Sequence, residues 1–286
     1  MRVYELKVEN QIGDVLTLTQ NENDYQIQKI EGLSPANGII NTSSIVGMDG
    51  ALFNSSKLDV KELVLYIKIN GNAEKNRNRL YTYFAVKKIC KIYYKNGERN
   101  VFIEGYVSSV QCDLFAQGEI AQISILCPYP YFKDMSEIVN DISNTIGLFV
   151  FPFTINENEP IPISDQAENR ETQIYNSSLN EIGIIINAQF AGNVPRLHIQ
   201  NTTTGEFFEV AYPFVDLDRL TINTNSGKKS IVLLRDGARV NIFPHIVNGS
   251  TFFQLHAGAN TFAFTAAGNE DKVTIQFSTR MEYAGV

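Results

Sequence analysis

Tryptophan is absent from this chain of 286 residues, and histidine and cysteine are rare, with three of each. An odd number of cysteines without a C-x-x-C spacing argues against both a disulfide framework and a zinc site. We therefore expect Cys90, Cys112 and Cys127 to be buried, reduced thiols. The three histidines match no metal-site spacing either, so the sequence predicts neither a bound metal nor a cofactor.

Long hydrophobic runs are also missing. No segment approaches the ~18 uninterrupted apolar residues of a membrane-spanning helix. The first residues, Met1 to Glu5, lack the apolar core of a signal peptide. The sequence thus predicts a protein that folds in a cytosol and does not enter a membrane.

Positive charge is scarce. The formal net charge is −7, of which residues 1–140 contribute −1 and residues 141–286 contribute −6. Without a basic patch, the chain is not expected to bind nucleic acid through its phosphates. Hydrophobic residues make up 44% and aromatic residues 11% of the chain, which is ample for the cores of about two domains.

Catalytic signatures are missing as well. The sequence contains no G-x-S-x-G, H-E-x-x-H or G-x-G-x-x-G pattern. The lysine-containing segment 227–230 has a faint likeness to a phosphate-binding loop, but its place between two strands favours a hairpin turn. Two close carboxylate pairs, Asp216 with Asp218 and Glu157 with Glu159, lie in loop-like sequence, where solvation explains them better than catalysis. We expect no enzyme.

The first half predicts a sheet with one helix. Residues 63–69 alternate as a strand, and Asn72 is placed to cap a helix over residues 73–88. Asn96-Gly97 between two apolar runs predicts a β-hairpin.

A segment of unusual composition, residues 31–58, precedes this helix. It is rich in glycine, serine and asparagine, yet it carries apolar side chains that a solvated loop would not need. We expect an arm that buries these side chains against a neighbouring subunit. The candidate interface residues of the arm are Ile39, Ile40, Ile45, Val46, Leu52 and Phe53.

Two further candidate surfaces follow from the sequence. Lys75, Arg77 and Arg79 lie on the predicted helix, where they form either a solvated face or a docking surface for an acidic partner. A proline-punctuated run then ends the first half, because each proline disfavours helix and interrupts strand pairing. We expect it to be an anchored corner between the domains, formed by Pro128, Tyr129, Pro130, Tyr131 and Phe132. Residues from Phe132 to about Asn144 are expected to form a short helix or a linker.

The second half reads as a β-sandwich. Turn signals such as Ser226-Gly227, Asp236-Gly237 and Asn248-Gly249 recur every 9 to 12 residues, and short apolar strands lie between them. Strands are predicted near residues 230–234, 251–255 and 272–277. The domains are therefore expected at residues 1–140 and 141–286.

Taken in order, these segments resemble the distal tail (Dit) proteins of long-tailed bacteriophages and prophages. In the first half the resemblance rests on residues 47–51, the strand at 63–69, the helix with its Leu80-Tyr81, and residues 123–132. In the second half it rests on Ile199 to Glu206, Leu220 to Thr224, Ser250 to Leu255 and the segment Tyr283 to Val286.

The resemblance implies a mainly β fold: an N-terminal β-barrel-like, tail-tube-like sheet domain with one helix, and a C-terminal galectin-like β-sandwich. It also implies a structural role. Such proteins form a hexameric ring at the virion tail tip that joins the major tail (tube) protein to a tail-associated lysin or spike and to receptor-binding or baseplate proteins. DNA passes through the lumen. Assembly would take place in the bacterial host cytoplasm.

Two alternatives remain open. A carbohydrate-binding module that recognises host-surface glycans fits the sandwich, but the chain has no tryptophan to stack on a sugar. A glycan-cleaving enzyme is motivated only by the carboxylate pairs.

Overall fold

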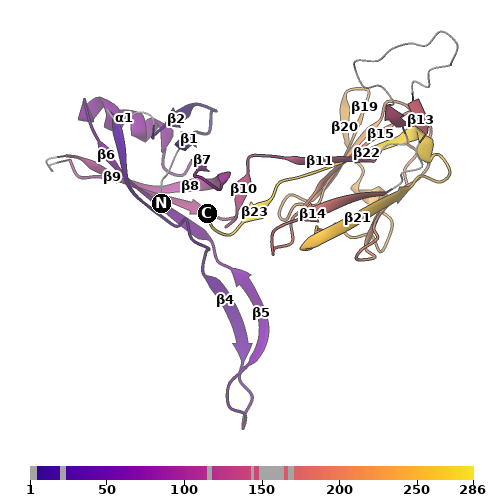
Figure 1. Ribbon diagram of the computed structural model, residues 1–286, viewed down its shortest axis with the longest axis horizontal. Coiled ribbons are helices and arrows are strands. Elements are labelled where there is room, and N and C mark those ends of the chain that lie inside the picture. Colours follow the sequence, from indigo (N-terminus) through magenta and orange to yellow (C-terminus); the bar gives the residue numbers. More distant parts are fainter. Residues whose placement is uncertain (1–4, 20–23, 115–117, 143–144, 148–163, 167–170) are drawn as a thin grey trace. The chain divides into compact units, whose positions relative to one another are not determined.

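The computed structural model describes residues 5–19, 24–114, 118–142, 145–147, 164–166 and 171–286 (Figure 1). It is mainly β, with antiparallel sheets and a single α-helix among the described residues. The chain divides into two compact units. Unit 1 consists of Met1–Met135 and Glu282–Val286, and unit 2 of Ser136–Met281. The return of the last five residues to unit 1 departs from the expected boundary, which assigns residues 141–286 to the second domain.

Unit 1 is built on a nine-stranded antiparallel sheet in the order β2-β1-β7-β8-β9-β6-β3, with β10 paired to β8 and to β23. Within the described residues no pairing joins β2 to β3, so the sheet is open rather than a closed barrel. A separate hairpin, β4 and β5, completes the unit (Figure 1). The elements are β1 (Glu5–Glu9), β2 (Val15–Thr17), β3 (Tyr25–Glu31), β4 (Gly38–Ser43), β5 (Leu52–Leu58), β6 (Lys61–Ile69), α1 (Ala73–Tyr83), β7 (Ile89–Lys95), β8 (Asn100–Cys112), β9 (Ile120–Cys127), β10 (Phe132–Asp134) and β23 (Glu282–Tyr283).

The core of unit 1 follows from strand alternation. In β6, Leu63, Leu65 and Ile67 point to one face and are buried, while the residues between them are more exposed. The neighbouring strand β9 contributes Ile123 and Ile125 to the same core. The predicted strand at residues 63–69 is confirmed, with two additional residues at its start.

Helix α1 begins where the sequence predicts it. The side chain of Asn72 accepts a hydrogen bond from the backbone N–H of Lys75 at 3.1 Å, which caps the first turn. The predicted end at residue 88 is wrong, because the helix ends at Tyr83. The buried Phe84 closes the last turn and Lys87 adopts a left-handed φ of 68°, so the chain reverses there and enters β7.

One glycine is required by close packing. A Cβ at Gly105 in β8 would lie 2.7 Å from both Cys127 Sγ and Ile125 Cγ2. Those distances are shorter than any van der Waals contact, so only glycine lets β9 pack here without displacement.

Unit 2 contains a six-stranded sheet in the order β11-β22-β15-β18-β19-β20 and a four-stranded sheet in the order β14-β21-β16-β17, both antiparallel. A two-stranded ribbon pairs β12 with β13. The elements are β11 (Ile138–Ile142), β12 (Thr145–Gly147), β13 (Ser164–Gln166), β14 (Glu171–Asn176), β15 (Ile185–Phe190), β16 (Leu197–Asn201), β17 (Phe207–Val210), β18 (Arg219–Asn223), β19 (Ser230–Arg235), β20 (Ala238–Asn241), η1 (Phe243–His245), β21 (Gly258–Thr265), η2 (Glu270–Lys272) and β22 (Val273–Thr279).

The two larger sheets of unit 2 share one core. Phe262 of β21 stacks on Phe277 of β22 with ring centroids 4.9 Å apart, and Phe253 packs against Phe262 at 5.5 Å. All three rings are buried. These contacts join the inner faces of the sheets, as in a β-sandwich.

Most of the predicted turns and strands of unit 2 are present. Asp236 and Gly237 have φ of 51° and 77° and form the turn between β19 and β20. The predicted strand at residues 251–255 is wrong. The backbone N–H of Thr251 donates to the carbonyl of Phe207, whereas that of Leu255 donates to the carbonyl of Ile182. These two partners belong to separate segments, so residues 251–255 do not pair with one neighbouring strand. The expected helix or linker after Phe132 is likewise replaced by strands β10 and β11.

Candidate assembly surfaces

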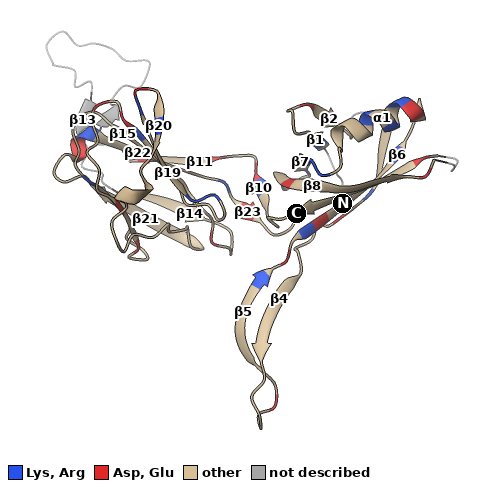
Figure 2. Ribbon diagram, turned by 180° about the vertical axis from the view of Figure 1, so that it is seen from behind, with Lys and Arg blue, Asp and Glu red and all other residues tan. Residues whose placement is uncertain are grey.

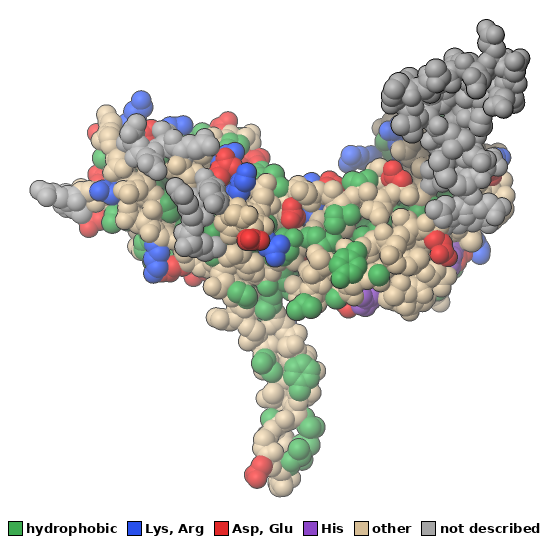
Figure 3. All heavy atoms as spheres, viewed as in Figure 1, with side chains coloured by type: hydrophobic (Ala, Val, Ile, Leu, Met, Phe, Trp, Pro, Cys, Tyr) green, Lys and Arg blue, Asp and Glu red, His purple; other side chains and the backbone are tan. Residues whose placement is uncertain are grey.

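The predicted arm is a two-stranded hairpin that extends from the sheet of unit 1 (Figure 1). Almost every residue of β4, β5 and the turn between them is exposed. Ile39 is half-buried, whereas Ile40 and Phe53 have 67% and 65% of their surface exposed. Ile45, Val46 and Leu52 are exposed as well. Figure 3 shows these apolar side chains along the arm, and Figure 2 shows that it carries little charge.

One buried lysine, Lys61, holds the base of the arm through hydrogen bonds. The ammonium group of Lys61 donates hydrogen bonds to the backbone carbonyls of Gly32, at 3.2 Å, and Ser34. It also donates to the carbonyl of Ala284, at 2.9 Å, and lies 5.0 Å from the centre of the Phe132 ring. Burial lowers the pKa of Lys61, and the nearby Cys127 offsets only part of this effect. The sequence analysis did not identify this residue.

A row of exposed apolar side chains crosses three strands of unit 1. Ile89 of β7 lies opposite Tyr106 of β8, which lies opposite Leu126 of β9. Each of the three is more than a third exposed. We call this set the apolar row. It leaves part of the outer face of the sheet uncovered.

The basic helix face is only partly free. Arg77 forms a two-pronged ion pair with Glu119, with both N–O distances at 2.8 Å, and is largely buried by it. Lys75 and Arg79 are exposed. Of the three predicted docking residues, Arg77 therefore already has a partner within the chain.

The proline-punctuated corner lies entirely within unit 1. Phe132 is part of the core, and Pro130 is buried while Pro128 is exposed. Tyr129 donates its phenolic hydrogen to Glu282 of β23, and the rings of Tyr129 and Tyr131 lie 5.2 Å apart. Burial and this carboxylate raise the pKa of Tyr129. The corner thus holds the C-terminal strand.

The cysteines are free thiols, as expected. Burial raises the pKa of Cys90 and of Cys127 to about 12, so neither is a thiolate at neutral pH. Cys112 is half-buried, which differs from the expectation that all three are buried.

The carboxylate candidates separate into different environments. Asp218 is 1% exposed and accepts two hydrogen bonds from Arg235, the first at 2.8 Å from Nε, while Asp216 is exposed. Burial alone would raise the pKa of Asp218, but the bonds from Arg235 and from the Val215 N–H outweigh it and lower the pKa. Asp218 therefore has a structural partner. Glu157 and Glu159 lie outside the described residues.

The remaining motifs are also accounted for. Segment 227–230 joins β18 to β19 as a hairpin turn, as predicted. His198 contacts Glu209 at 3.0 Å, and His256 contacts Glu181 at 3.1 Å. In the part of the chain that is described, no group of three or more histidine, cysteine or acidic side chains is arranged to hold a metal ion. Among the same residues, no helix is long and apolar enough to cross a membrane.

Comparison with known proteins gives a family match and a fold match. Residues 178–281, within unit 2, match the family model described as "Siphovirus-type tail component, C-terminal domain". The crystal structure of the Dit protein of phage SPP1 is similar over 97% of this chain and 99% of that one, with a TM-score of 0.68 and 15% identity. A chain of the phage P2 baseplate in its activated conformation is similar over 100% of both chains, with a TM-score of 0.56 and 10% identity. No curated protein matches the sequence.

Proposed function

We propose that this chain is a structural phage tail component of the distal tail type and not an enzyme. In this proposal it forms a hexameric ring at the virion tail tip. The ring joins the tail tube to the tail-tip spike or lysin and to the receptor-binding apparatus, and its lumen passes DNA. The observation that carries the proposal is the exposed apolar arm.

In an isolated subunit the exposed apolar side chains of the arm bury little surface and contribute little to stability. Ile40, Val46 and Phe53 face solvent, and burying each such side chain contributes roughly 1.5–3 kcal/mol. Exposed contiguous apolar surface in a soluble protein marks an interaction site. A neighbouring copy of the chain is the partner that every subunit is certain to meet, so the arm fits an interface between subunits.

The same unit offers a surface to receive an arm. The apolar row of Ile89, Tyr106 and Leu126 is uncovered, and among the described strands none pairs with the outer edges of β2 and β3. Unpaired edges are usually protected, and pairing between subunits protects them. Repetition of one such head-to-tail contact closes into a ring when the rotation permits. The barrel-like, tail-tube-like character of unit 1 would be completed in this way.

The remaining surfaces suit partners of the ring. Lys75 and Arg79 on α1 are exposed, and we assign them to an acidic partner, for which the tube protein is our candidate. We assign unit 2 a galectin-like sandwich that offers surfaces to receptor-binding or baseplate proteins. Assembly would precede packaging into virions and take place in the host cytoplasm.

The experiment is the subunit count of the purified chain, measured by native mass spectrometry and cryo-EM with and without a tube protein. Wild type should give hexamers, and the double variant Ile40→Asp, Phe53→Asp should stay monomeric while keeping its circular dichroism spectrum. Leu179→Asp, at an even more exposed aliphatic position in unit 2, is the control and should assemble normally. A monomeric wild type under all these conditions, or hexamers of the arm variant, would overturn the proposal.

A second function, carbohydrate binding by unit 2, is favoured by one observation, a polar hollow on its six-stranded sheet.

A further inference from the structure

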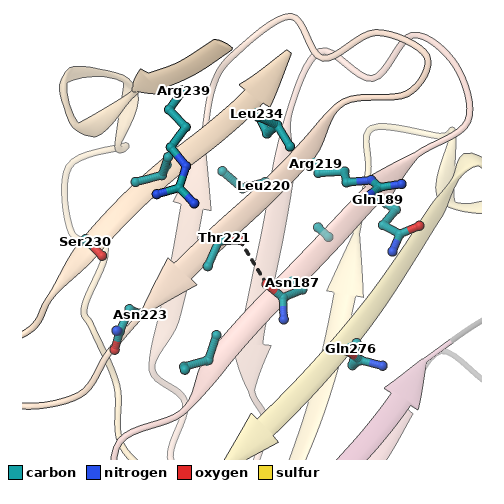
Figure 4. A pocket seen from close by; sticks show the side chains of 13 residues that line it. Asn187, Gln189, Arg219, Leu220, Thr221, Asn223, Ser230, Leu234, Arg239 and Gln276 are labelled. Atoms are coloured by element: carbon teal, nitrogen blue, oxygen red, sulfur yellow. Dashed lines mark hydrogen bonds between the residues drawn. The ribbon is translucent and has the colours of Figure 1, made fainter. Parts of the chain in front are cut away.

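The outer face of the six-stranded sheet carries a hollow with a volume of about 520 Å³ (Figure 4). Its lining comes from five neighbouring strands in the order β22, β15, β18, β19 and β20. Strands β22 and β15 are far from each other in the sequence. The strands are in register, so the lining forms rows across the sheet. One row runs from Gln189 through Arg219 and Leu234 to Arg239.

A second row lies two residues further along each strand. It runs from Gln276 through Asn187 and Thr221 to Val232. Thr221 donates its hydroxyl to the side-chain oxygen of Asn187 at 2.9 Å, and Figure 4 shows this bond between adjacent strands. The hollow is thus lined mainly by amide, hydroxyl and guanidinium groups, with aliphatic side chains between them.

The two arginines are the feature that selects a ligand. Neither Arg219 nor Arg239 forms an ion pair within the described part of the chain, and no acidic residue lines the hollow. The nearby Arg235 shows the contrast, because it is paired with the buried Asp218. The chain has a formal net charge of −7, so acidic side chains outnumber basic ones. Against this excess, two arginines on one sheet face without an acidic partner among the described residues stand out. Guanidinium groups bind phosphate and carboxylate through paired hydrogen bonds.

The spacing of the arginines suits an extended ligand. One strand, β19, separates the strands that carry them, which places their backbones about 10 Å apart. A ligand that contacts both would cross the amides and hydroxyls between them. No aromatic ring lines the hollow, so an uncharged sugar would lack a stacking surface, and the charge of the ligand must supply much of the attraction.

We propose that this hollow binds an anionic saccharide, a sugar or polyol that carries phosphate or carboxylate groups. Arg219 and Arg239 hold the charged groups, and the amides of Gln189, Asn187 and Gln276 bind hydroxyl groups. This inference rests on the second function proposed above, carbohydrate binding by unit 2. The site lies within unit 2 and does not require the ring, so it can be tested separately from assembly.

The test is calorimetric titration of the full chain at low salt with glucose 6-phosphate, glucuronate, glucose and inorganic phosphate. Either anionic sugar should bind more tightly than glucose and than phosphate, and the comparison between the two identifies the charged group. The double variant Arg219→Ala, Arg239→Ala should lose about tenfold or more in affinity, because each charge-assisted bond is worth roughly that factor. Arg196→Ala, which removes the same charge from an exposed arginine of unit 2, is the control and should bind as wild type does.

Three results would overturn the site. One is the absence of binding by either anionic sugar at millimolar concentration, and another is equal affinity of wild type and the double variant. The third is equal affinity for inorganic phosphate and the sugar phosphate, which would indicate an adventitious ion only. The subunit count of the same samples is read independently, since a monomer that binds refutes the ring and leaves the site intact.

Discussion

Lys61 and Ala284 are joined by a hydrogen bond of 2.9 Å from the lysine ammonium group to the backbone carbonyl, across 223 residues of sequence. The same ammonium group holds the carbonyls of Gly32 and Ser34. Lys61 therefore ties the base of the arm to the C-terminal strand within unit 1.

Lys61→Met should destabilise unit 1. The methionine keeps the apolar stem but removes the donor from three part-buried carbonyl oxygens, and we expect a loss of about 1–3 kcal/mol. Urea unfolding, followed by the fluorescence of the tyrosines, measures it. Lys57→Met, a change of the same kind on the exposed arm, should have little effect. Equal stability of the two variants would show that the hydrogen bonds of Lys61 do not stabilise unit 1.

The hydrogen bonds of the buried Lys61 also predict a pH dependence of stability. Burial lowers the pKa of Lys61 below its ordinary value of 10.5 in the folded state. Between the folded pKa and 10.5, the unfolded chain binds a proton that the folded chain lacks, so stability rises with pH in that window. The difference in unfolding free energy between wild type and Lys61→Met should therefore grow as pH approaches 10.5. A difference that shrinks with rising pH would contradict this assignment.

Asp218→Asn should destabilise the protein at neutral pH by about 1–3 kcal/mol, because it weakens two charge-assisted hydrogen bonds to Arg235. The folded pKa of Asp218 lies below its ordinary value. Its stabilising effect is complete above the unfolded pKa and is lost as pH falls through the folded pKa. Wild type and variant should accordingly converge in acid unfolding experiments. Asp216→Asn, at an exposed position, serves as the control.

Gly105→Ala should cost about 1–3 kcal/mol through overpacking, since the added methyl group would press on Cys127 and Ile125. Gly38→Ala is the comparison, because nothing lies within 4 Å of the added atom there. Thermal melts compare the melting temperatures of the two variants. A Gly105→Ala variant as stable as the Gly38→Ala variant would contradict the close packing at Gly105.

Tyr129→Phe should lower stability by about 1 kcal/mol through loss of the bond to Glu282. Tyr131→Phe is the natural reference, because the two rings are neighbours in the corner and no hydrogen bond from Tyr131 is present in the described structure. Differential scanning calorimetry should separate the two. If both lose the same amount, the hydroxyl of Tyr129 contributes nothing specific.

The thiols should be nearly inert in the native protein. Cys90 and Cys127, with pKa values of about 12, should resist a thiol reagent at pH 8, and only Cys112 should react. All three should react in urea. Rapid reaction of more than one native thiol would indicate that the core of unit 1 opens readily.

Local patterns predicted much of this fold. The alternation at residues 63–69, the cap at Asn72 and the turn at Asp236-Gly237 each depend on a few neighbouring residues, and each is present. The arm was recognisable from composition, but its hairpin form was not, because its pairing includes a bulge at Asn41/Thr42. The end of α1 depends on the left-handed Lys87, which no pattern marks.

The missed features all depend on long-range register. Lys61 is in phase with Leu63 and Leu65, so its buried position was readable from alternation, but its carbonyl partners come from distant segments. The hollow on the six-stranded sheet requires β15, β18 and β22 to be neighbours, which their order in the sequence does not reveal. Whether the arm residues, the helix face and the corner serve assembly remains a prediction.

The two-part makeup of unit 1 has a consequence for the timing of synthesis. The ribosome makes β10 and Lys61 early, but β23 and Ala284 emerge only after all of unit 2 has been translated. At about 5–20 residues per second, that interval lasts roughly 7 to 30 seconds. During this time the base of the arm lacks its last hydrogen-bond partner. The hydrogen bond between Lys61 and Ala284 is therefore among the contacts of unit 1 that form after unit 2 has been translated.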